Sequence, residues 1–348
     1  MSTAERGERA GGIAIIGLFF RFYRYALVRI LLVKTSSLGD VVHNLPVVSD
    51  LAGHFPDVEI DWVVEESFAE IPRLHPAVRN VIPVAVRRWR KSPFFPATWR
   101  EMIAFRQRLR ADRYDAVLDS QGLLKSGLIA AQAIGRRIGY DRASAREPIA
   151  ARCYNQTVAV ARTMHAVERN RLLAARAFGY EVASPPDYGI GAPPLTANWL
   201  PAGDYAVLLT ATSRADKEWR HDDWLALGMA LIATGLRCVL PSGNAAERGR
   251  AAGLANSLGR AIAAPAMNLA ELAGLLAGAA LVVGVDTGLV HLAAALKRPT
   301  LALYCASDPE LTGVLAGAGA TRGALNLGHR GAAPTAGEAI HGALRLLD

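Results

Sequence analysis

The sequence predicts an α/β protein made of two halves, each built around a parallel sheet. The chain has 348 residues, which fits two domains of about 150 residues each. From residue 27 onward, short aliphatic runs alternate with longer helical patterns, as in β-α-β units. A stretch rich in proline and glycine interrupts this alternation near the middle of the chain. We therefore expect domains over residues 28–183 and 205–348, joined by a linker over 184–204.

The first half is predicted to contain four strands and three helices. β-branched and aliphatic runs place the strands at residues 28–34, 60–66, 81–86 and 116–121. Helical periodicity places the helices near residues 41–53, 97–111 and 122–134.

The second half repeats this organisation. Its predicted strands cover residues 205–212, 236–243, 280–288 and 299–305. Its predicted helices lie near residues 222–234, 245–258, 269–278 and 288–297. Two Rossmann-like halves that face one central cleft are the simplest architecture for this pattern. In such sheets ligands bind at the carboxyl ends of strands, so we look for the chemistry there.

Composition and charge limit the class of protein. Hydrophobic residues make up 51% and charged residues 20%, which excludes a disordered or fibrous chain. The net charge of +8 favours anionic partners such as phosphates, nucleic acid or an anionic bilayer. Three widely spaced cysteines argue against a disulfide framework and against a thiolate zinc site.

Residues 1–27 are interpreted as an N-terminal extension. Its apolar stretch, residues 13–20, is too short to span a bilayer, because a spanning helix needs about 20 residues. The basic and aromatic residues that follow do not resemble a signal-peptide cleavage site. An upstream start site and a short interfacial anchor both remain open interpretations of this segment.

The first predicted strand ends in a turn of small residues, KTSSLGD (34–40), that opens a helix. Free backbone N–H groups and the positive end of the helix dipole attract anions at such a place. The turn lacks the G-x-G-x-x-G pattern, which argues against an NAD enzyme. Asp40 has two open roles. It can cap the helix, the commoner role, or act as a general base toward an alcohol, because a carboxylate beside a helix start is kept ionised.

A loop after the first strand of the second half suits a diphosphate. It reads TATSRADKEW (210–219) and precedes a predicted helix. Thr212 and Ser213 offer hydroxyl donors, and Lys217 offers one compact cation for non-bridging oxygens. The alternative is an ordinary solvated loop.

A second strand of this half ends in GVDTGLVH (284–291). Gly288 allows the backbone to approach a phosphate closely, and Asp286 or Thr287 can cap the helix that follows. His291 lies one turn inside that helix, where it is either a core histidine or a donor to the same ligand.

Three further features bear on ligands. Glu247, after the predicted strand at 236–243, can accept hydrogen bonds from ribose hydroxyls, although a surface glutamate is the simpler interpretation. Nine basic and two acidic residues lie between Arg87 and Arg113, which favours a phosphorylated or carboxylated partner, since the stacking platforms of nucleic-acid readers are missing. The pair Glu65 and Glu66 has no neighbouring His or Asp in sequence, so we expect no catalytic metal.

Together these motifs resemble the lipopolysaccharide heptosyltransferases. The resemblance runs in order from about Val28 to Gly313 through VKTSSLGDVVHNLP, DWVVEE, VIPVAVRRWRK, DSQGLLKS, SAREPIAARCYN, HAVERN, TSRADKEW and VDTGLVHLAAAL. It implies a GT-B fold, with an N-terminal acceptor domain and a C-terminal donor domain. The implied reaction moves L-glycero-D-manno-heptose from ADP-heptose onto a Kdo sugar of Kdo-modified lipid A. The anomeric centre is inverted, and neither a cofactor nor a metal is required.

The resemblance also implies residue roles. Asp40 matches the catalytic base, and Lys217, with Thr212 and Ser213, matches the residues that neutralise the departing diphosphate. Further matches to the ADP-heptose site are Glu247 at the ribose, Met267 at the adenine, and Asp286, Thr287, Gly288 and His291 at the heptose and phosphates. Matches to the acceptor site are Arg87, Arg90, Lys91 and Arg146, and His165 falls in the motif HAVERN. The chain departs from the family pattern at Ser213, Ala215 and Ser242.

Two alternatives remain beside the Kdo-directed enzyme. A heptosyltransferase that acts on a later core heptose is the nearer one, and VIPVAVRRWRK favours the Kdo-directed type over it. A non-catalytic basic module for membrane or nucleic acid would leave the donor loops unused. Since the implied acceptor is anchored in the cytoplasmic leaflet, we expect a cytoplasmic enzyme, bound peripherally to the anionic inner membrane and without a nucleic-acid partner.

Overall fold

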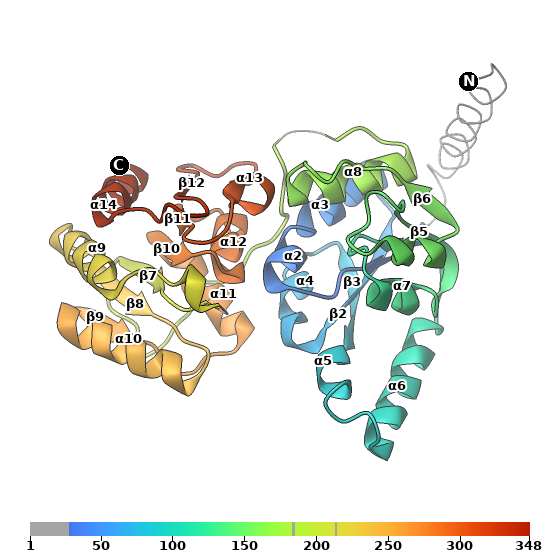
Figure 1. Ribbon diagram of the computed structural model, residues 1–348, viewed down its shortest axis with the longest axis horizontal. Coiled ribbons are helices and arrows are strands. Elements are labelled where there is room, and N and C mark those ends of the chain that lie inside the picture. The colour runs from blue at the N-terminus through green and yellow to red at the C-terminus, as the bar shows by residue number, and fades with distance from the viewer. Residues whose placement is uncertain (1–27, 183–184, 213) are drawn as a thin grey trace. The chain divides into compact units, whose positions relative to one another are not determined.

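The computed structural model describes residues 28–182, 185–212 and 214–348, which form two compact units (Figure 1). Unit 1 contains the described chain up to Ser36 together with His43–Gly189. Unit 2 contains Ser37–Val42 and Ile190–Asp348. By its contacts, the short helix after the first strand therefore belongs to unit 2. The predicted extension over 1–27 lies outside the described residues.

Unit 1 is built on a six-stranded parallel sheet in the order β3-β2-β1-β4-β5-β6. Its strands are β1 (Arg29–Val33), β2 (Glu59–Glu65), β3 (Val78–Val84), β4 (Arg113–Asp119), β5 (Ile134–Tyr140) and β6 (Gln156–Val158). Its helices are α3 (Leu45–His54), α4 (Glu70–Arg73), α5 (Val86–Trp89), α6 (Pro96–Leu109), α7 (Leu124–Ala130) and α8 (Ala166–Phe178). The strand order reverses between β1 and β4, and ligands bind at such switch points in open α/β sheets.

The core of unit 1 lies on both faces of this sheet. The central strand β1 reads RILLV, and its last four residues are buried, as expected for a parallel strand covered on both faces. Leu31 and Val33 pack in a cluster with Phe105 and Leu109 of α6 and with Ile129 of α7. Helices α3 and α8 contact each other, and α8 also contacts β5 and β6.

Unit 2 repeats the topology with the order β12-β11-β10-β7-β8-β9, again all parallel. Its strands are β7 (Tyr205–Leu209), β8 (Arg237–Leu240), β9 (Ala261–Ala263), β10 (Leu281–Val285), β11 (Thr300–Leu303) and β12 (Ala324–Leu327). Its helices are α2 (Leu38–Val42), α9 (His221–Ala233), α10 (Ala245–Leu258), α11 (Leu269–Ala277), α12 (Gly288–Ala295), α13 (Pro309–Thr312) and α14 (Ala336–Leu347). The switch point lies between β7 and β10.

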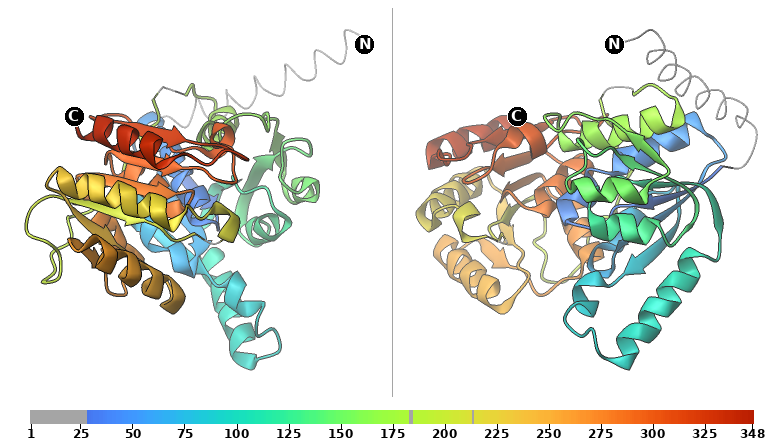
Figure 2. Two further views of the ribbon diagram at one scale, coloured as in Figure 1. Left: turned by 60° about the vertical axis from the view of Figure 1, so that its left-hand side comes forward. Right: turned by 45° about the vertical axis from the view of Figure 1, so that its right-hand side comes forward.

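The predicted fold class is confirmed, since each unit is a parallel sheet flanked by helices (Figure 2). Each of the eight predicted strands overlaps an observed strand. Four strands were not predicted, namely β5, β6, β9 and β12. Five helices were not predicted either, namely α4, α5, α8, α13 and α14.

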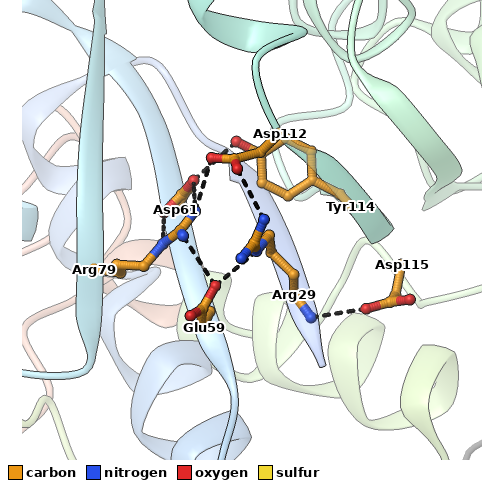
Figure 3. A network of polar contacts seen from close by, with 7 residues as sticks. All are labelled: Arg29, Glu59, Asp61, Arg79, Asp112, Tyr114 and Asp115. Atoms are coloured by element: carbon orange, nitrogen blue, oxygen red, sulfur yellow. Dashed lines mark hydrogen bonds and ion pairs between the residues drawn. The ribbon is translucent and has the colours of Figure 1, made fainter. Parts of the chain in front are cut away.

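A polar network crosses the amino end of the sheet of unit 1 (Figure 3). Asp61 on β2 accepts two hydrogen bonds from the guanidinium of Arg79 on β3, at 2.9 and 2.7 Å, and one from the Tyr114 hydroxyl on β4 at 2.8 Å. Arg29 on β1 pairs with Glu59 on β2 at 2.6 Å. The network ties four strands together at the edge opposite to the one where ligands bind. Its members are Arg29, Glu59, Asp61, Arg79, Asp112, Tyr114 and Asp115.

Candidate functional site

The loops after the neighbouring strands β7 and β10 bring several predicted donor residues together at the carboxyl edge of unit 2. Lys217, in a 3-10 turn after β7, places its Nζ 2.5 Å from Oδ2 of Asp286, which directly follows β10. The Thr212 hydroxyl donates to the Asp286 carbonyl oxygen at 3.5 Å. Ser307, after β11, donates its hydroxyl to Asp286 Oδ2 at 2.5 Å. Three loops therefore meet on one carboxylate at the switch point.

The Asp286 carboxylate is held in its charged form. Burial opposes ionisation, but hydrogen bonds from Lys217 and Ser307 outweigh it and lower the pKa of Asp286. The positive charges of Lys217 and His291 act in the same direction. A half-buried ammonium paired with a single carboxylate is a polar centre that can exchange this partner for a phosphate oxygen.

Helix α12 presents its N-terminus beside this centre. Thr287 occupies the N-cap position with an extended backbone, but its side chain makes no capping hydrogen bond. The prediction that Asp286 or Thr287 caps the helix is therefore wrong, because the Asp286 carboxylate is held by Lys217 and Ser307 instead. Within the described chain no side chain caps the first turn of α12, which starts at Gly288. Such a helix start is suited to an anion.

Two glycines allow α2 to pack closely on α12. A methyl group on Gly288 would lie 2.6 Å from the Cβ of Leu38 in α2, a distance that Cβ atoms do not adopt. A methyl group on Gly39 would lie 3.3 Å from Cδ2 of the buried His291. The sequence therefore requires small residues on both helices, and this contact assigns α2 to unit 2.

Asp40 lies in the first turn of α2, on the segment that packs against α12. Its Oδ2 accepts a hydrogen bond from the Ser37 backbone N–H at 2.8 Å and one from the Ser37 hydroxyl at 3.2 Å. The capping role is thus confirmed. The same bonds fix the orientation of a carboxylate that stays half exposed.

The other predicted donor residues follow β8 and β9 or lie in the loop after β7. Glu247, in the first turn of α10, accepts hydrogen bonds from the Gly243 N–H at 2.7 Å and from the Asn244 side chain at 2.6 Å. Its carboxylate therefore organises the loop that carries Ser242. In the described residues the Ser242 hydroxyl is buried without a hydrogen-bond partner. Met267 lies half-buried in the loop before α11. Ser213 lies outside the described residues.

In unit 1, the charges of three of the four predicted acceptor residues act on Lys125. Burial lowers the pKa of the Lys125 ammonium, and the positive charges of Arg87, Arg146 and Arg90 lower it further, against the opposing effect of Glu65. The Lys125 ammonium also donates to the Ser36 hydroxyl at 3.0 Å. An anion bound here would relieve the repulsion among these cations.

The basic residues of α5 and the turn after it differ in their partners. The Arg87 guanidinium lies over the Phe68 ring, 5.0 Å from its centroid. Arg88 forms ion pairs with Glu66 and Glu101, so its charge is already compensated. Lys91, the fourth predicted acceptor residue, is exposed in the turn after α5.

Comparison with known proteins connects these features to one family. Residues 102–338 match the model of glycosyltransferase family 9, the heptosyltransferases. The chain belongs to this family. It is therefore a glycosyltransferase.

Relatives and solved structures agree with this family 9 assignment. The lipopolysaccharide heptosyltransferase 1 of Escherichia coli K12 is 47% identical over 287 residues, which cover 82% of this chain and 90% of the relative. The enzyme of the same name from Pseudomonas aeruginosa is 48% identical over 288 residues, covering 82% of this chain and 81% of the relative. A solved structure of E. coli heptosyltransferase WaaC with ADP is 44% identical, with a TM-score of 0.79 over 86% of this chain and 94% of that one.

Two polar residues of this family 9 chain were missed in the sequence. Ser307 follows β11, and the rule that ligands meet at strand ends would have included it. Lys125 lies in the quoted motif DSQGLLKS, at the second residue of the short helix α7, but that motif was given no role of its own. His165 caps α8, since its Nδ1 accepts from the Val167 N–H at 3.2 Å.

Proposed function

We propose that this chain transfers L-glycero-D-manno-heptose from ADP-heptose to a Kdo sugar of Kdo-modified lipid A, in the assembly of the lipopolysaccharide core. One observation carries the proposal: unit 2 places the Lys217–Asp286 centre, the start of α12 and the carboxylate of Asp40 in a single compact unit. The relatives named lipopolysaccharide heptosyltransferase 1 support the acceptor class. A structure titled E. coli heptosyltransferase WaaC with ADP-2-deoxy-2-fluoro heptose supports the donor.

The donor binds in unit 2. Its diphosphate binds at the N-terminus of α12, and Lys217 and Thr212 donate hydrogen bonds to phosphate oxygens. Glu247 accepts from the ribose hydroxyls, and Met267 packs against the adenine. Ser242 supports this placement, because its buried hydroxyl lacks a hydrogen-bond partner in the described chain.

The reaction is a single displacement that inverts the anomeric centre. The Asp40 carboxylate takes the proton from the acceptor hydroxyl as its oxygen forms a bond to the anomeric carbon. The bond between that carbon and the diphosphate oxygen breaks at the same time, and ADP leaves with the electron pair. Negative charge grows on the diphosphate during this step, so Lys217 and the amides of α12 stabilise the transition state more than the ground state.

In this reaction the Lys217 ammonium neutralises the charge on the diphosphate, a role that a divalent metal can play in other glycosyltransferases. Glu65 and Glu66 are engaged elsewhere: Glu65 accepts from the Arg87 N–H at 2.9 Å, and Glu66 pairs with Arg88. Across the described ranges, no three His, Cys, Asp or Glu side chains form a group that could hold a metal.

The acceptor binds in unit 1. Arg87, Arg90, Lys91 and Arg146 face an acceptor that carries carboxylate and phosphate groups, with Lys125 as a fifth cation. None of the described helices combines the length and apolar character needed to cross a bilayer. We place the enzyme at the cytoplasmic face of the inner membrane, attracted by its net charge of +8.

An ADP-release assay tests the proposal. The purified chain is incubated with ADP-heptose and one of three acceptors: Kdo-modified lipid A, lipid A without Kdo, or a core that already carries heptose. We expect ADP release, together with an added heptose in the product mass, only with the first acceptor. Transfer only to the heptose-bearing core would replace the proposal with the later core reaction, and transfer to none would refute it.

A further inference from the structure

A cluster of exposed apolar side chains lies on one segment of unit 1. The α6 patch consists of Phe94, Phe95, Trp99, Met102 and Ile103. Phe94 is 91% exposed, Phe95 66%, Trp99 57% and Ile103 55%. Of the ten large apolar side chains that are exposed in the described residues, these five lie within ten consecutive positions. Scattered apolar side chains are normal on a surface, but a contiguous patch of this kind indicates a binding surface.

Helix α6 has two apolar faces with different partners. Phe105 and Leu109 lie on one face and pack into the core of unit 1. Trp99 and Ile103 are four residues apart, so they lie side by side on another face of the helix that stays exposed. The α6 patch is thus exposed to solvent, while Phe105 and Leu109 anchor α6 to the core of unit 1. Helix α6 and the loop before it project from the rest of unit 1 in every view (Figures 1 and 2).

Basic residues frame the α6 patch. The exposed cations near it are Arg90, Lys91, Arg100, Arg106, Arg108 and Arg110. Glu101, the one acidic residue of α6, pairs with Arg88 and also accepts from the Trp89 ring N–H. Tryptophan and phenylalanine beside arginine and lysine are the composition of segments that lie in the membrane interface. A second copy of the chain would bring the same positive charge, so charge complementarity favours an anionic bilayer over self-association.

We propose that the α6 patch inserts into the interface of an anionic lipid bilayer, with Phe94, Phe95, Trp99 and Ile103 below the headgroups and the flanking arginines on lipid phosphates. This membrane contact rests on the proposed function, since a lipid-anchored acceptor requires an enzyme at the membrane. Lys and Arg side chains long enough to reach the headgroups suit this placement.

Co-sedimentation with vesicles tests the proposal on the full chain. The vesicles contain phosphatidylcholine alone or with phosphatidylglycerol. We expect binding to the anionic vesicles, and a loss of about tenfold or more in affinity for the variant Phe94→Ser/Phe95→Ser/Trp99→Ser/Ile103→Ser. The matched control, Met229→Ser/Leu311→Ser, removes exposed apolar side chains of unit 2 and should bind like wild type. The loop variant Phe94→Ser/Phe95→Ser leaves α6 unchanged and should show part of the loss.

Fluorescence quenching locates the contact. Trp99 is the only exposed tryptophan, and the other five, which also lie in the described chain, are buried or half-buried. Lipids brominated on their acyl chains should quench the wild-type fluorescence, and Trp99→Phe should abolish the quenching. Equal binding of the four-residue variant and wild type would overturn the proposal. A dimer in sedimentation that the same variant dissociates, without vesicle binding, would show that a second copy covers the patch and would also overturn it.

A water-soluble acceptor fragment separates this inference from the proposed function. Both the wild type and the four-residue variant should transfer heptose to it at the same rate. Failure of transfer by a wild type that binds vesicles would reject the proposed function alone. Transfer by a wild type that ignores anionic vesicles would reject the membrane surface alone.

Discussion

Among single residues, Lys217 has the clearest electrostatic role. Its ammonium pairs with the half-buried carboxylate of Asp286, which directly precedes the N-cap residue of α12. We predict that Lys217→Ala weakens ADP binding by about 10- to 100-fold, because a charge-assisted hydrogen bond to phosphate is lost. Isothermal titration calorimetry measures this directly.

The control for this variant is Arg214→Ala in the same loop. Arg214 is exposed and pairs with Asp216, so its removal should leave the ADP affinity unchanged. Equal affinity of Lys217→Ala and wild type would remove Lys217 from the donor site.

A second residue, His75, makes the stability of unit 1 depend on pH. Burial lowers the pKa of His75 from 6.5 to about 4, with Asp187 acting in the opposite direction. Its Nε2 lies 2.9 Å from the Ser49 hydroxyl. Between pH 6.5 and 4 the unfolded chain binds a proton that the folded chain does not. Stability therefore falls as the pH drops through this window and levels off below pH 4.

Urea unfolding at pH 7.5 and pH 5 measures the effect. We predict that wild type loses about 2 kcal/mol of unfolding free energy between these values through His75. The variant His75→Gln has no titratable group at this position. Its unfolding free energy should therefore fall by about 2 kcal/mol less than that of wild type between pH 7.5 and pH 5. The same pH dependence in both proteins would rule out His75 as its source.

At the scale of elements, the contact between α2 and α12 places Asp40 in unit 2. Gly288→Ala puts a methyl group against Leu38, so the helices must separate. We predict a loss of turnover of about tenfold or more, because a catalytic group displaced by about 1 Å loses much of its effect. Steady-state ADP release provides the measurement.

Gly253→Ala in α10 is the matched control, because nothing lies within 4 Å of the added methyl group. Alanine favours a helix over glycine by about 0.5–1 kcal/mol, so this variant should be slightly more stable and fully active. Full activity of Gly288→Ala as well would show that the close packing has no functional role.

The polar network of Figure 3 links strands at the amino end of the first sheet. Asp61 is almost fully buried and holds both Arg79 and Tyr114. We predict that Asp61→Ala destabilises unit 1 by about 3–5 kcal/mol, since its partners lose a buried carboxylate. Chemical denaturation followed by circular dichroism measures this.

Arg73→Ala removes an exposed ion pair with Glu70 and should cost less than about 0.5 kcal/mol. If both variants had similarly small effects, the network would contribute little to the sheet.

For the whole molecule, strands were predictable where both faces are covered. The run RILLV of β1 has the apolar character of a central strand, and the structure buries it. The missed strands β6, β9 and β12 are sheet edges of three or four residues, and β5 lies beside an edge with two arginines and two glycines in IGRRIGY. Short, partly exposed strands lack the continuous apolar run that indicates a strand in sequence.

The candidate site was predictable only in part, because some of its contacts join segments that are far apart in the sequence. Lys217 and Asp286 both follow strands, and the rule for strand ends brings them together. No sequence pattern shows that Ser37–Val42 packs with a helix some 250 residues later, because that contact depends on the tertiary fold. The contacts of Asp286 with Lys217 and Ser307 are tertiary too, and no sequence pattern indicates that Thr287 makes no capping bond.

The central claim is that Asp40 acts as a base and is more than a helix cap. Asp40→Asn keeps a side-chain oxygen that can accept from Ser37, so it retains the cap and removes only the basic group. Turnover by ADP release and ADP affinity by calorimetry are measured on this one variant. We predict a loss of turnover of about 10²–10⁴-fold with unchanged ADP affinity. Turnover close to that of wild type would contradict it.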